Sequence, residues 1–250
     1  MTFKHEKQVF DEQGFVVVRG LLKRHDFDEL RRNLERYIAD VVPTLGDGDA
    51  FYVDHERPET LKQLMRMGCD PFFRDMMRQP QFTALAEALI GEPVEADEPE
   101  WFDKPPGTSS VTPPHQDNFY FSLAPANVAT LWMALDEVDA ENGCLRYVDG
   151  SHRRGFRPHA KSKILGFSQG ITDFSADDFS REVAVRLSPG DVVAHHGMTI
   201  HRADANLSAT RHRRSFALVF RGVSCRRDDE AYARYLASAR KQQQELGLDV

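Results

Sequence analysis

The sequence predicts a mainly β fold with flanking helices, and three observations lead to this prediction. Short runs rich in β-branched and aromatic residues lie at 128–138, 183–187, 192–194 and 215–221. Clusters of Gly, Pro, Asn and Ser separate these runs, which is typical of antiparallel sheets. Helical periodicity is concentrated towards the two ends of the chain. Because 250 residues can fold around one β core of this kind, we expect a single domain spanning residues 1–250.

The N-terminal part, about 1–91, is expected to be mainly helical around one buried strand. The strand is the apolar run at 15–22. The segment behind it predicts a helix, because its apolar residues recur at steps of three and four: Leu30, Leu34, Tyr37, Ile38 and Val41. Two further helices are predicted at about 59–68 and 80–90, and Gly91 is placed to end the second of them.

The remainder of the chain predicts a β core at about 92–222 and a C-terminal helix at about 228–247. Within the core, the segment 155–182 has weak periodicity and many polar residues. Connections of this length inside compact domains are often lids or binding loops. We therefore expect this segment to lie beside a binding site.

Charge and cysteine content argue against several classes of function. The chain has 39 acidic and 32 basic side chains, and a net charge of −7 disfavours nucleic acid as a partner. Its apolar runs are far shorter than the roughly 18 residues that a membrane span requires. Cys69, Cys144 and Cys225 are spread out without a C-x-x-C motif, so no disulfide framework is expected. These features predict a cytoplasmic protein that acts on a small molecule, without a membrane partner.

Histidine and carboxylate side chains suggest a metal site. His115 and Asp117 are two residues apart, and in an extended strand such residues point to the same face about 7 Å apart. About one such pair is expected by chance, and its alternative interpretation is a polar surface strand. A second imidazole is available from His195, His196 or His201. Two imidazoles and one carboxylate form the facial triad of non-haem Fe(II) enzymes. Since His195 and His196 are adjacent, at most one of them can face such a metal.

Nine short motifs then occur in one order between Lys104 and Arg214. They are KPPG at 104–107, HQD at 115–117, Trp132, NGCL at 142–145, GSHRRG at 150–155, PGD at 189–191, HHG at 195–197, H-x₄-N-x-S from His201 to Ser208, and Arg213-Arg214. With this set of motifs in register, the sequence resembles the phytanoyl-CoA dioxygenase family of Fe(II)/2-oxoglutarate oxygenases.

The resemblance implies a double-stranded β-helix, also called a jelly-roll or cupin core, with Fe(II), 2-oxoglutarate and O₂ as cofactor and cosubstrates. It implies that His115, Asp117 and His201 are the metal ligands. The implied reaction converts 2-oxoglutarate to succinate and CO₂ and hydroxylates an unactivated C–H bond.

The family's 2-oxoglutarate arginine lies 11 or 12 residues beyond the distal histidine, which selects Arg213. Arg211 has the same strand parity and is the alternative, whereas Arg214 should face the other way. Trp132 and Ser151 align with positions that contact the cosubstrate. Ala203 departs from the family pattern, since a small polar residue is common two positions after the distal histidine.

The substrate side of the site is expected to be aromatic. If the strand that carries His115 continues, Phe119 and Phe121 share the face of the metal ligands and exclude water from the reaction. Lys104 or Arg157 would anchor the polar end of a small substrate at the mouth. A CoA thioester is disfavoured, because no basic run in the expected rim loops would bind its phosphates.

Two other functions remain open. A cupin dioxygenase or isomerase could use the same metal without 2-oxoglutarate, although the arginine beyond the distal histidine argues against it. A non-catalytic small-molecule-binding jelly roll is the third alternative, and the intact ligand triad argues against that one. The presence of Asp117 speaks against a halogenase, in which a small residue replaces the carboxylate.

Overall fold

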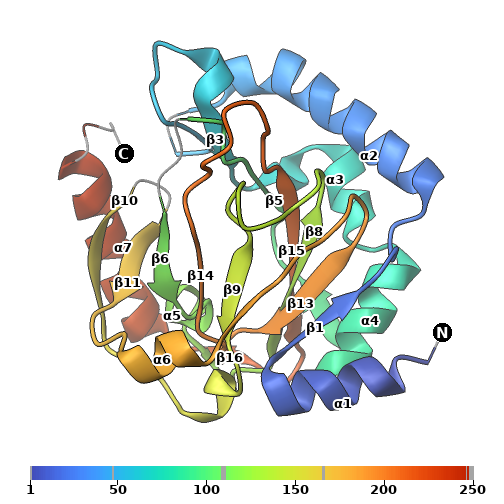
Figure 1. Ribbon diagram of the computed structural model, residues 1–250, viewed down its shortest axis with the longest axis vertical. Coiled ribbons are helices and arrows are strands. Elements are labelled where there is room, and N and C mark those ends of the chain that lie inside the picture. The colour runs from blue at the N-terminus through green and yellow to red at the C-terminus, as the bar shows by residue number, and fades with distance from the viewer. Residues whose placement is uncertain (1, 47, 108–110, 165–166, 246, 248–250) are drawn as a thin grey trace.

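Two facing antiparallel sheets form the centre of the protein (Figure 1). The computed structural model describes residues 2–46, 48–107, 111–164, 167–245 and 247. The larger sheet has the strand order β1-β13-β8-β15-β5-β3-β2, with β4 also paired to β15. The smaller sheet has the order β12-β9-β14-β6. The predicted mainly β fold with flanking helices is therefore confirmed.

The strands of the two main sheets come from distant parts of the chain. Those of the larger sheet are β1 (Phe15–Val18), β2 (Ala50–Tyr52), β3 (Leu61–Leu64), β4 (Val94–Ala96), β5 (Glu100–Phe102), β8 (Val128–Ala134), β13 (Val192–His196) and β15 (Ser215–Gly222). Those of the smaller sheet are β6 (Thr112–His115), β9 (Leu145–Val148), β12 (Glu182–Ala184) and β14 (His201–Ala203). Two separate pairs are β10 (His159–Ile164) with β11 (Phe167–Ile171), and β7 (Leu123–Ala124) with β16 (Arg226–Arg227).

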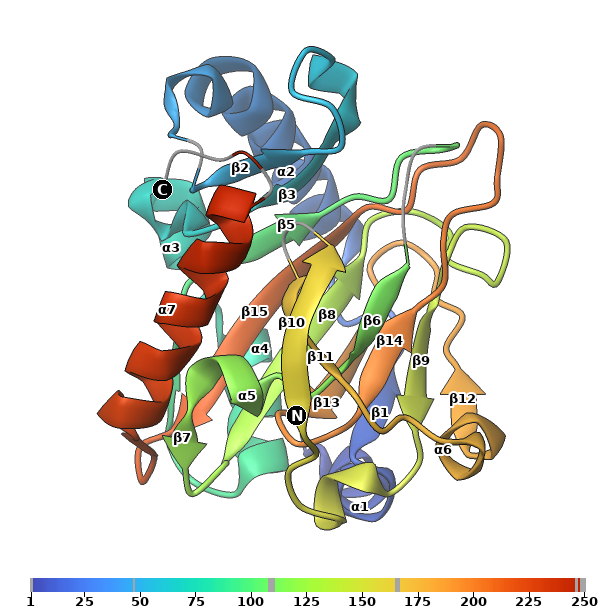
Figure 2. The same cartoon turned by 90° about the vertical axis from the view of Figure 1, so that its left-hand side faces the viewer.

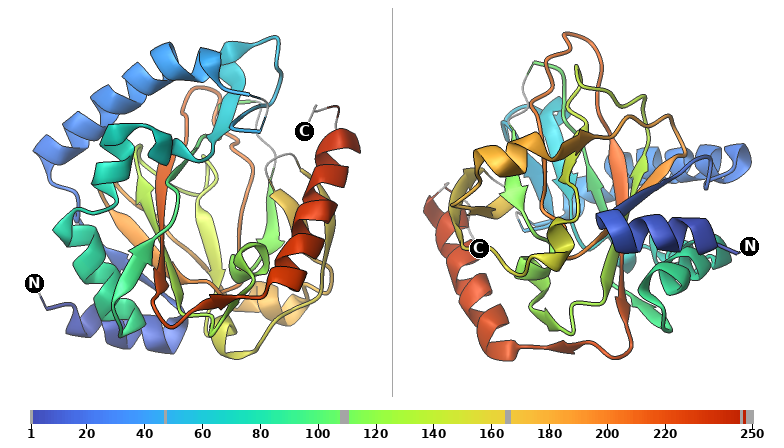
Figure 3. Two further views of the ribbon diagram at one scale, coloured as in Figure 1. Left: turned by 180° about the vertical axis from the view of Figure 1, so that it is seen from behind. Right: turned by 60° about the horizontal axis from the view of Figure 1, so that its bottom comes forward.

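Helices cover the larger sheet on the side away from the smaller one (Figure 3). They are α1 (Lys4–Gln13), α2 (Arg24–Arg36), α3 (Pro71–Met76) and α4 (Pro80–Ile90). Two short helices, α5 (Asn118–Phe121) and α6 (Ala176–Ser180), follow β6 and β11. The long C-terminal helix α7 (Asp229–Glu245) packs against β10 and β11 at the other side of the molecule (Figure 2).

Strand alternation divides the apolar residues of the larger sheet between two cores. One set, which includes Leu131, Ala194 and Phe216, packs against the helices. The next residues along the same strands, such as Trp132, Val193 and Ala217, point inward to the smaller sheet and pack with its Tyr147. Because successive strand residues face opposite sides, a residue on the inward set is directed to the space between the sheets. This inward face carries the candidate site.

The helix predicted at 80–90 and the C-terminal helix are confirmed, whereas the strand predicted at 15–22 is limited to Phe15–Val18. Gly91 adopts φ 89° and ends α4, as expected. The C-terminal helix ends at Glu245, and residue 246 of its predicted span lies outside the described residues.

The helix predicted at about 59–68 is wrong. Its central residues form strand β3, flanked by single 3₁₀ turns at Pro58–Thr60 and Met67–Cys69. This strand pairs with β2 on one side and with β5 on the other. Main-chain hydrogen bonds to two distant segments therefore override the short helical pattern of apolar side chains, which local sequence cannot reveal.

Segment 155–182 also differs from the expected loop, because it contains the β10–β11 hairpin and helix α6. All six residues of β10 are at least partly exposed. The two buried residues of β11, Ser168 and Gln169, are polar, which explains why the apolar periodicity of this segment is weak. The hairpin lies beside β6, which ends at a candidate metal ligand.

Leu85 of α4 tests how strongly the helical layer stabilises the larger sheet. Its side chain is fully buried among residues of the helices and the sheet. Leu85→Ala should lower the free energy of unfolding by about 2–5 kcal/mol, since it leaves a cavity, as measured by urea denaturation. Leu207, which is 77% exposed, provides the matched control, and Leu207→Ala should cost less than about 0.5 kcal/mol. Equal losses in both variants would contradict this packing.

Candidate active site

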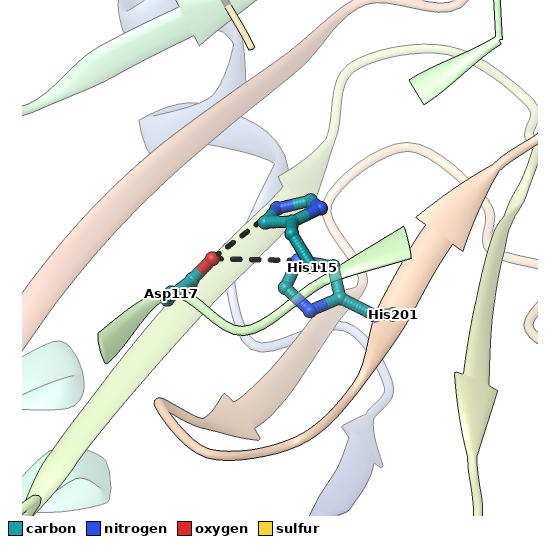
Figure 4. A group of neighbouring side chains, drawn as sticks. All are labelled: His115, Asp117 and His201. Carbon is teal, nitrogen blue, oxygen red and sulfur yellow. Dashed lines mark ion pairs between the residues drawn. The ribbon is translucent and has the colours of Figure 1, made fainter. Parts of the chain in front are cut away.

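Three side chains from the smaller sheet and the turn behind it converge on one point (Figure 4). His115 is the last residue of β6 and lies opposite His201, the first residue of β14. Asp117 follows β6 directly, and its Oδ1 lies 3.5 Å from Nε2 of each histidine. The potential ligand atoms of all three residues are within 4.8 Å of one another. This is the geometry of a facial set of two imidazoles and one carboxylate.

Main-chain carbonyls determine which nitrogen of each histidine carries the proton. His115 Nδ1 lies 2.8 Å from the carbonyl oxygen of Pro113, and His201 Nδ1 lies 3.0 Å from that of Thr199. A carbonyl only accepts hydrogen bonds, so both Nδ1 atoms must donate. Nε2 of each ring is then the nitrogen directed to the point that the histidines share with Asp117, which is the orientation that a metal ligand requires.

The second oxygen of Asp117 is held by the larger sheet. Thr130 Oγ1 on β8 donates to Asp117 Oδ2 at 2.7 Å. His195 Nε2 on β13 lies 2.9 Å from the same oxygen. His195 Nδ1 in turn lies 3.0 Å from the hydroxyl of Tyr147. Since Oδ2 is occupied by these two donors, Oδ1 is the oxygen left to face the histidines.

The electrostatics favour a cation at this point. Burial alone would raise the pKa of Asp117, but His201 and His195 nearby hold it well below its usual range. Burial, assisted by His115, lowers the pKa of His201 well below that of free histidine. The site therefore contains an ionised carboxylate and a neutral imidazole in a dry environment. This donor set fits Fe(II), since imidazole and carboxylate are ligands that suit this ion.

The adjacent histidines of β13 have different roles, as the sequence predicted from their opposite faces. His195 is almost completely buried and contacts Asp117 as described. His196 points to the helical side, where its ring lies 5.9 Å from that of Phe10. Only the first of the two belongs to the site.

Arg213 is the arginine that the structure places inside the protein. It is only 4% exposed, and its guanidinium carbon lies 5.2 Å from the centre of the Trp132 ring. Its Nη1 donates to Ser215 Oγ at 3.3 Å, and its Nε has no hydrogen-bond partner among the described residues. Burial lowers the pKa of Arg213 to about 10. A buried guanidinium without a carboxylate partner in the described chain is suited to bind an anionic ligand.

The neighbouring arginines are engaged elsewhere. Arg211 forms ion pairs with Asp139 and Glu141 at the surface. Arg214 pairs with Asp136 through two of its nitrogen atoms. These contacts favour Arg213 over Arg211, the alternative that the sequence left open.

A small cavity of about 40 Å³ lies beside Arg213. Phe167 lines it and also packs against His115, with ring centres 5.7 Å apart, so the cavity adjoins the metal site. Lys104 is buried in its wall, where burial, followed by Arg213 and Lys62, lowers the pKa of Lys104 well below its usual value. The main chains of Lys104 and Arg213 also exchange two hydrogen bonds. Lys104 therefore lies beside Arg213 in the interior rather than at an outer rim.

Two other residues expected near the cosubstrate occupy different positions. Trp132 follows Thr130 by two residues on β8, so both side chains point to the interior. Its ring packs against the guanidinium of Arg213, as described above. Ser151 is fully buried, and its Oγ accepts a hydrogen bond from the main-chain nitrogen of Ile200 at 2.8 Å. Ser151 thus supports the residue before His201.

The extended strand expected through Phe119 and Phe121 is wrong, because the chain turns into α5 after β6. Phe119 stacks on His159 with ring centres 4.2 Å apart, and Phe121 packs against a separate apolar cluster. The residue that reaches the site from α5 is Tyr120, whose ring centre lies 5.7 Å from that of His115. In a helix, residues two apart point in different directions, so Phe119 and Phe121 do not share the face of the metal ligands as they would in an extended strand.

Arg157, expected at the mouth, is held by two carboxylates. It forms ion pairs with Asp173 and Asp178. Its main-chain nitrogen donates to Gln116 Oε1 at 2.9 Å. The Gln116 amide also donates to the carbonyls of Gly155 and Met198. Gln116, which lies between His115 and Asp117 in the sequence, therefore connects segment 155–157 with the segment that precedes β14.

Sequence reasoning missed Thr130, Tyr147, Gln116 and Tyr120. Thr130 could have been found, because it shares strand parity with Trp132 in the predicted strand at 128–138. Tyr147 and Tyr120 carried no such signal, since their positions depend on how the two sheets and α5 pack.

The fold and the site together define a class of protein, the jelly-roll oxygenases with a two-histidine, one-carboxylate metal site. The model of the phytanoyl-CoA dioxygenase family matches residues 10–215, and the chain belongs to this family. The resemblance inferred from the sequence motifs is thereby confirmed.

Two relatives illustrate the similarity. The chain is 27% identical to peroxisomal phytanoyl-CoA dioxygenase of Rattus norvegicus over 217 residues, which cover 80% of this chain and 63% of the rat protein. It is 26% identical to 1-deoxypentalenic acid 11-beta-hydroxylase of Streptomyces exfoliatus over 213 residues, covering 80% of this chain and 74% of the relative. The match thus spans less than two thirds of the length of the rat protein.

Solved structures share the fold. The epimerase SnoN, in complex with Fe3+, alpha ketoglutarate and nogalamycin RO, superposes with a TM-score of 0.72 at 23% identity, covering 88% of this chain and 84% of SnoN. EctD from S. alaskensis, with 2-oxoglutarate and 5-hydroxyectoine, gives a TM-score of 0.71 at 16% identity, covering 88% and 76%. The predicted jelly-roll core is confirmed. In the described part of the chain, no helix is long and apolar enough to cross a membrane.

The hydrogen bond from Thr130 to Asp117 predicts an effect on metal affinity. Thr130→Val keeps the shape of the side chain but removes this donor, so Fe(II) affinity should fall by about tenfold, the low end of the range for partners of metal ligands. Anaerobic calorimetric titration with Fe(II) measures the change. Thr83→Val, on α4, removes a hydroxyl that bonds only within its own helix and should leave the affinity unchanged. Equal affinities in all three proteins would refute this role of Thr130.

Proposed function

We propose that the protein is an Fe(II)/2-oxoglutarate-dependent dioxygenase that hydroxylates an unactivated C–H bond of a small molecule. The observation that carries this proposal is the buried guanidinium of Arg213, whose Nε has no hydrogen-bond partner among the described residues, beside the set of His115, Asp117 and His201. The chemistry that Fe(II) supplies at such a site is O₂ activation coupled to conversion of 2-oxoglutarate to succinate and CO₂.

The residues of this chain would bind Fe(II) and 2-oxoglutarate, orient the ligand imidazoles and exclude water. His115, Asp117 and His201 would hold Fe(II), and the carbonyls of Pro113 and Thr199 keep both imidazoles in the required tautomer. Arg213 would clamp the distal carboxylate of 2-oxoglutarate by two charge-assisted hydrogen bonds. Trp132, below the guanidinium, is 5% exposed and excludes water from this end of the site. Exclusion of water strengthens each of these electrostatic contacts.

The two alternative functions are less well supported by the same geometry. A metal enzyme that does not use 2-oxoglutarate gains nothing from a buried guanidinium next to the metal site. A non-catalytic binding protein does not require two histidines in the same tautomer whose Nε2 atoms, together with one carboxylate oxygen, are directed at one point. The carboxylate of Asp117 also occupies the position that a halogenase leaves for halide. We propose a cytoplasmic location and a small-molecule substrate, as expected from the sequence.

Loss of either histidine ligand should abolish iron binding. His115→Ala and His201→Ala each remove one of three donors, so neither variant should retain stoichiometric Fe(II) or form succinate from 2-oxoglutarate. Iron content after anaerobic reconstitution and succinate release are the measurements. His25→Ala alters an exposed surface histidine and serves as the control. Full iron content and activity in either ligand variant would exclude this assignment.

Replacing Arg213 tests the cosubstrate. Arg213→Lys keeps the positive charge but loses the planar pair of donors, so the KM for 2-oxoglutarate should rise by about tenfold or more, equivalent to about 1.4 kcal/mol. The assay is succinate formation at varied 2-oxoglutarate. Arg211→Lys is the matched control, because Arg211 already pairs with Asp139 and Glu141. If Arg211→Lys raises KM and Arg213→Lys does not, the wrong arginine has been assigned.

A further inference from the structure

Glu100 is a carboxylate inside the protein that the proposed chemistry does not use. On β5 it pairs with Ala217 of β15, while the next residue, Trp101, pairs with Phe216. Trp101 and Phe216 pack against the helices, so Glu100 projects to the opposite, inward face. Ala217 and Trp132, which are cross-strand partners, share that face. Glu100 therefore belongs to the same interior as the metal site.

Gln63 places a second hydrogen-bond acceptor beside Glu100. It lies on β3 opposite Phe102, is only 4% exposed, and lines the cavity next to Arg213. Its amide group is a hydrogen-bonding neighbour of the Glu100 carboxylate. Gln63 Oε1 is buried and has no hydrogen-bond partner in the described part of the chain. An unsatisfied buried acceptor costs about 1–3 kcal/mol, which a donor group on a ligand would offset.

Charge is distributed unevenly across this interior. Arg213, Lys104 and Lys62 line the cavity beside which the proposed function places 2-oxoglutarate, and Gln63 contributes to the same lining. Glu100 is not among the residues that line this cavity, and burial, followed by the carboxylates of Asp117 and Asp97, raises the pKa of Glu100 to about 8. Within the described residues Glu100 forms no ion pair, and the nearby Arg66 is paired with Asp49. A positive group beside Glu100 would favour the ionised form of its carboxyl, whereas an anion would favour the protonated form.

Aromatic rings connect Glu100 to the metal site. Tyr235 of α7 is an electrostatic neighbour of Glu100. Its ring centre lies 5.4 Å from that of Tyr120, which in turn lies 5.7 Å from that of His115. Aromatic faces attract cations and exclude water, so these tyrosines are compatible with a cationic group near Glu100. This connection from Glu100 to His115 passes through two tyrosine rings.

We propose that Glu100 and Gln63 recognise an ammonium group on the substrate. This inference rests on the proposed function, because it assigns the substrate class of the same site. Both side chains offer oxygen acceptors, and an ammonium offers three donors with a charge that favours the ionised form of the partly buried Glu100 carboxyl. A hydroxyl offers one donor and no charge, and a carboxylate is repelled. The anchor therefore differs from Lys104 and Arg157, the residues expected from the sequence.

Three four-carbon probes test the assignment in the full-length protein loaded with Fe(II) and 2-oxoglutarate under anaerobic conditions. Calorimetry or ligand-detected NMR should show that n-butylammonium binds at least about tenfold more tightly than 1-butanol and that butyrate does not bind at this position. Glu100→Gln, which preserves shape, should weaken n-butylammonium binding by about tenfold or more, and Gln63→Leu should weaken it as well. Glu95→Gln removes an exposed carboxylate from the neighbouring strand β4 and should have no effect.

The outcomes separate this inference from the proposed function. Binding of 2-oxoglutarate to the Fe(II) protein is measured first, and its failure contradicts the proposed function itself. If 2-oxoglutarate binds but n-butylammonium does not, or if 1-butanol or butyrate binds equally well, the ammonium site is refuted while the dioxygenase assignment stands. Unchanged n-butylammonium affinity in Glu100→Gln also refutes it. If that variant does not fold, Gln63→Leu and the ranking of the three probes on the unaltered protein still decide.

Discussion

The candidate site depends on one strand pairing, that of β6 with β14, which sets His201 opposite His115. The chain turns into α5 directly after β6, and this turn brings Asp117 back beside both rings. The larger sheet completes the arrangement, because Thr130 and His195 hold the oxygen of Asp117 that does not face the histidines. The donor set is thus assembled from both sheets. Metal binding and sheet packing are therefore coupled.

The same interior keeps unlike charges apart. Arg213 and Lys104 lie on neighbouring segments joined by main-chain hydrogen bonds, next to the cavity that adjoins His115. Glu100 projects from β5 on the same inward face but beside Gln63 and Tyr235. In a dry interior, where charges interact strongly, the proposed sites for 2-oxoglutarate and for an ammonium group of the substrate would depend on this difference.

The sequence predicted those features that depend on neighbouring residues along the chain. It did not predict those that depend on contacts between distant segments. The strands β8 and β15 follow from the runs rich in β-branched and aromatic residues at 128–138 and 215–221. The opposite faces of His195 and His196 follow from the period-two alternation of a strand. The strand through Phe119 and Phe121 was wrong because the chain enters a helix, and the helix at 59–68 was wrong because those residues pair with two distant strands. Arg157 is taken up by Asp173 and Asp178, partners that no local pattern reveals.

By itself the sequence determined the order of the motifs and, through their resemblance to a known family, the family itself. The three residues proposed to bind iron were implied by this resemblance, since an H-x-D spacing alone is expected about once by chance. Only the tertiary structure decided which arginine lies inside, since Arg211, Arg213 and Arg214 differ in the carboxylates that surround them rather than in their own chemistry. It also brought Glu100 and Gln63 together from separate strands. Burial and pairing arise when distant segments pack, and a linear pattern does not contain them.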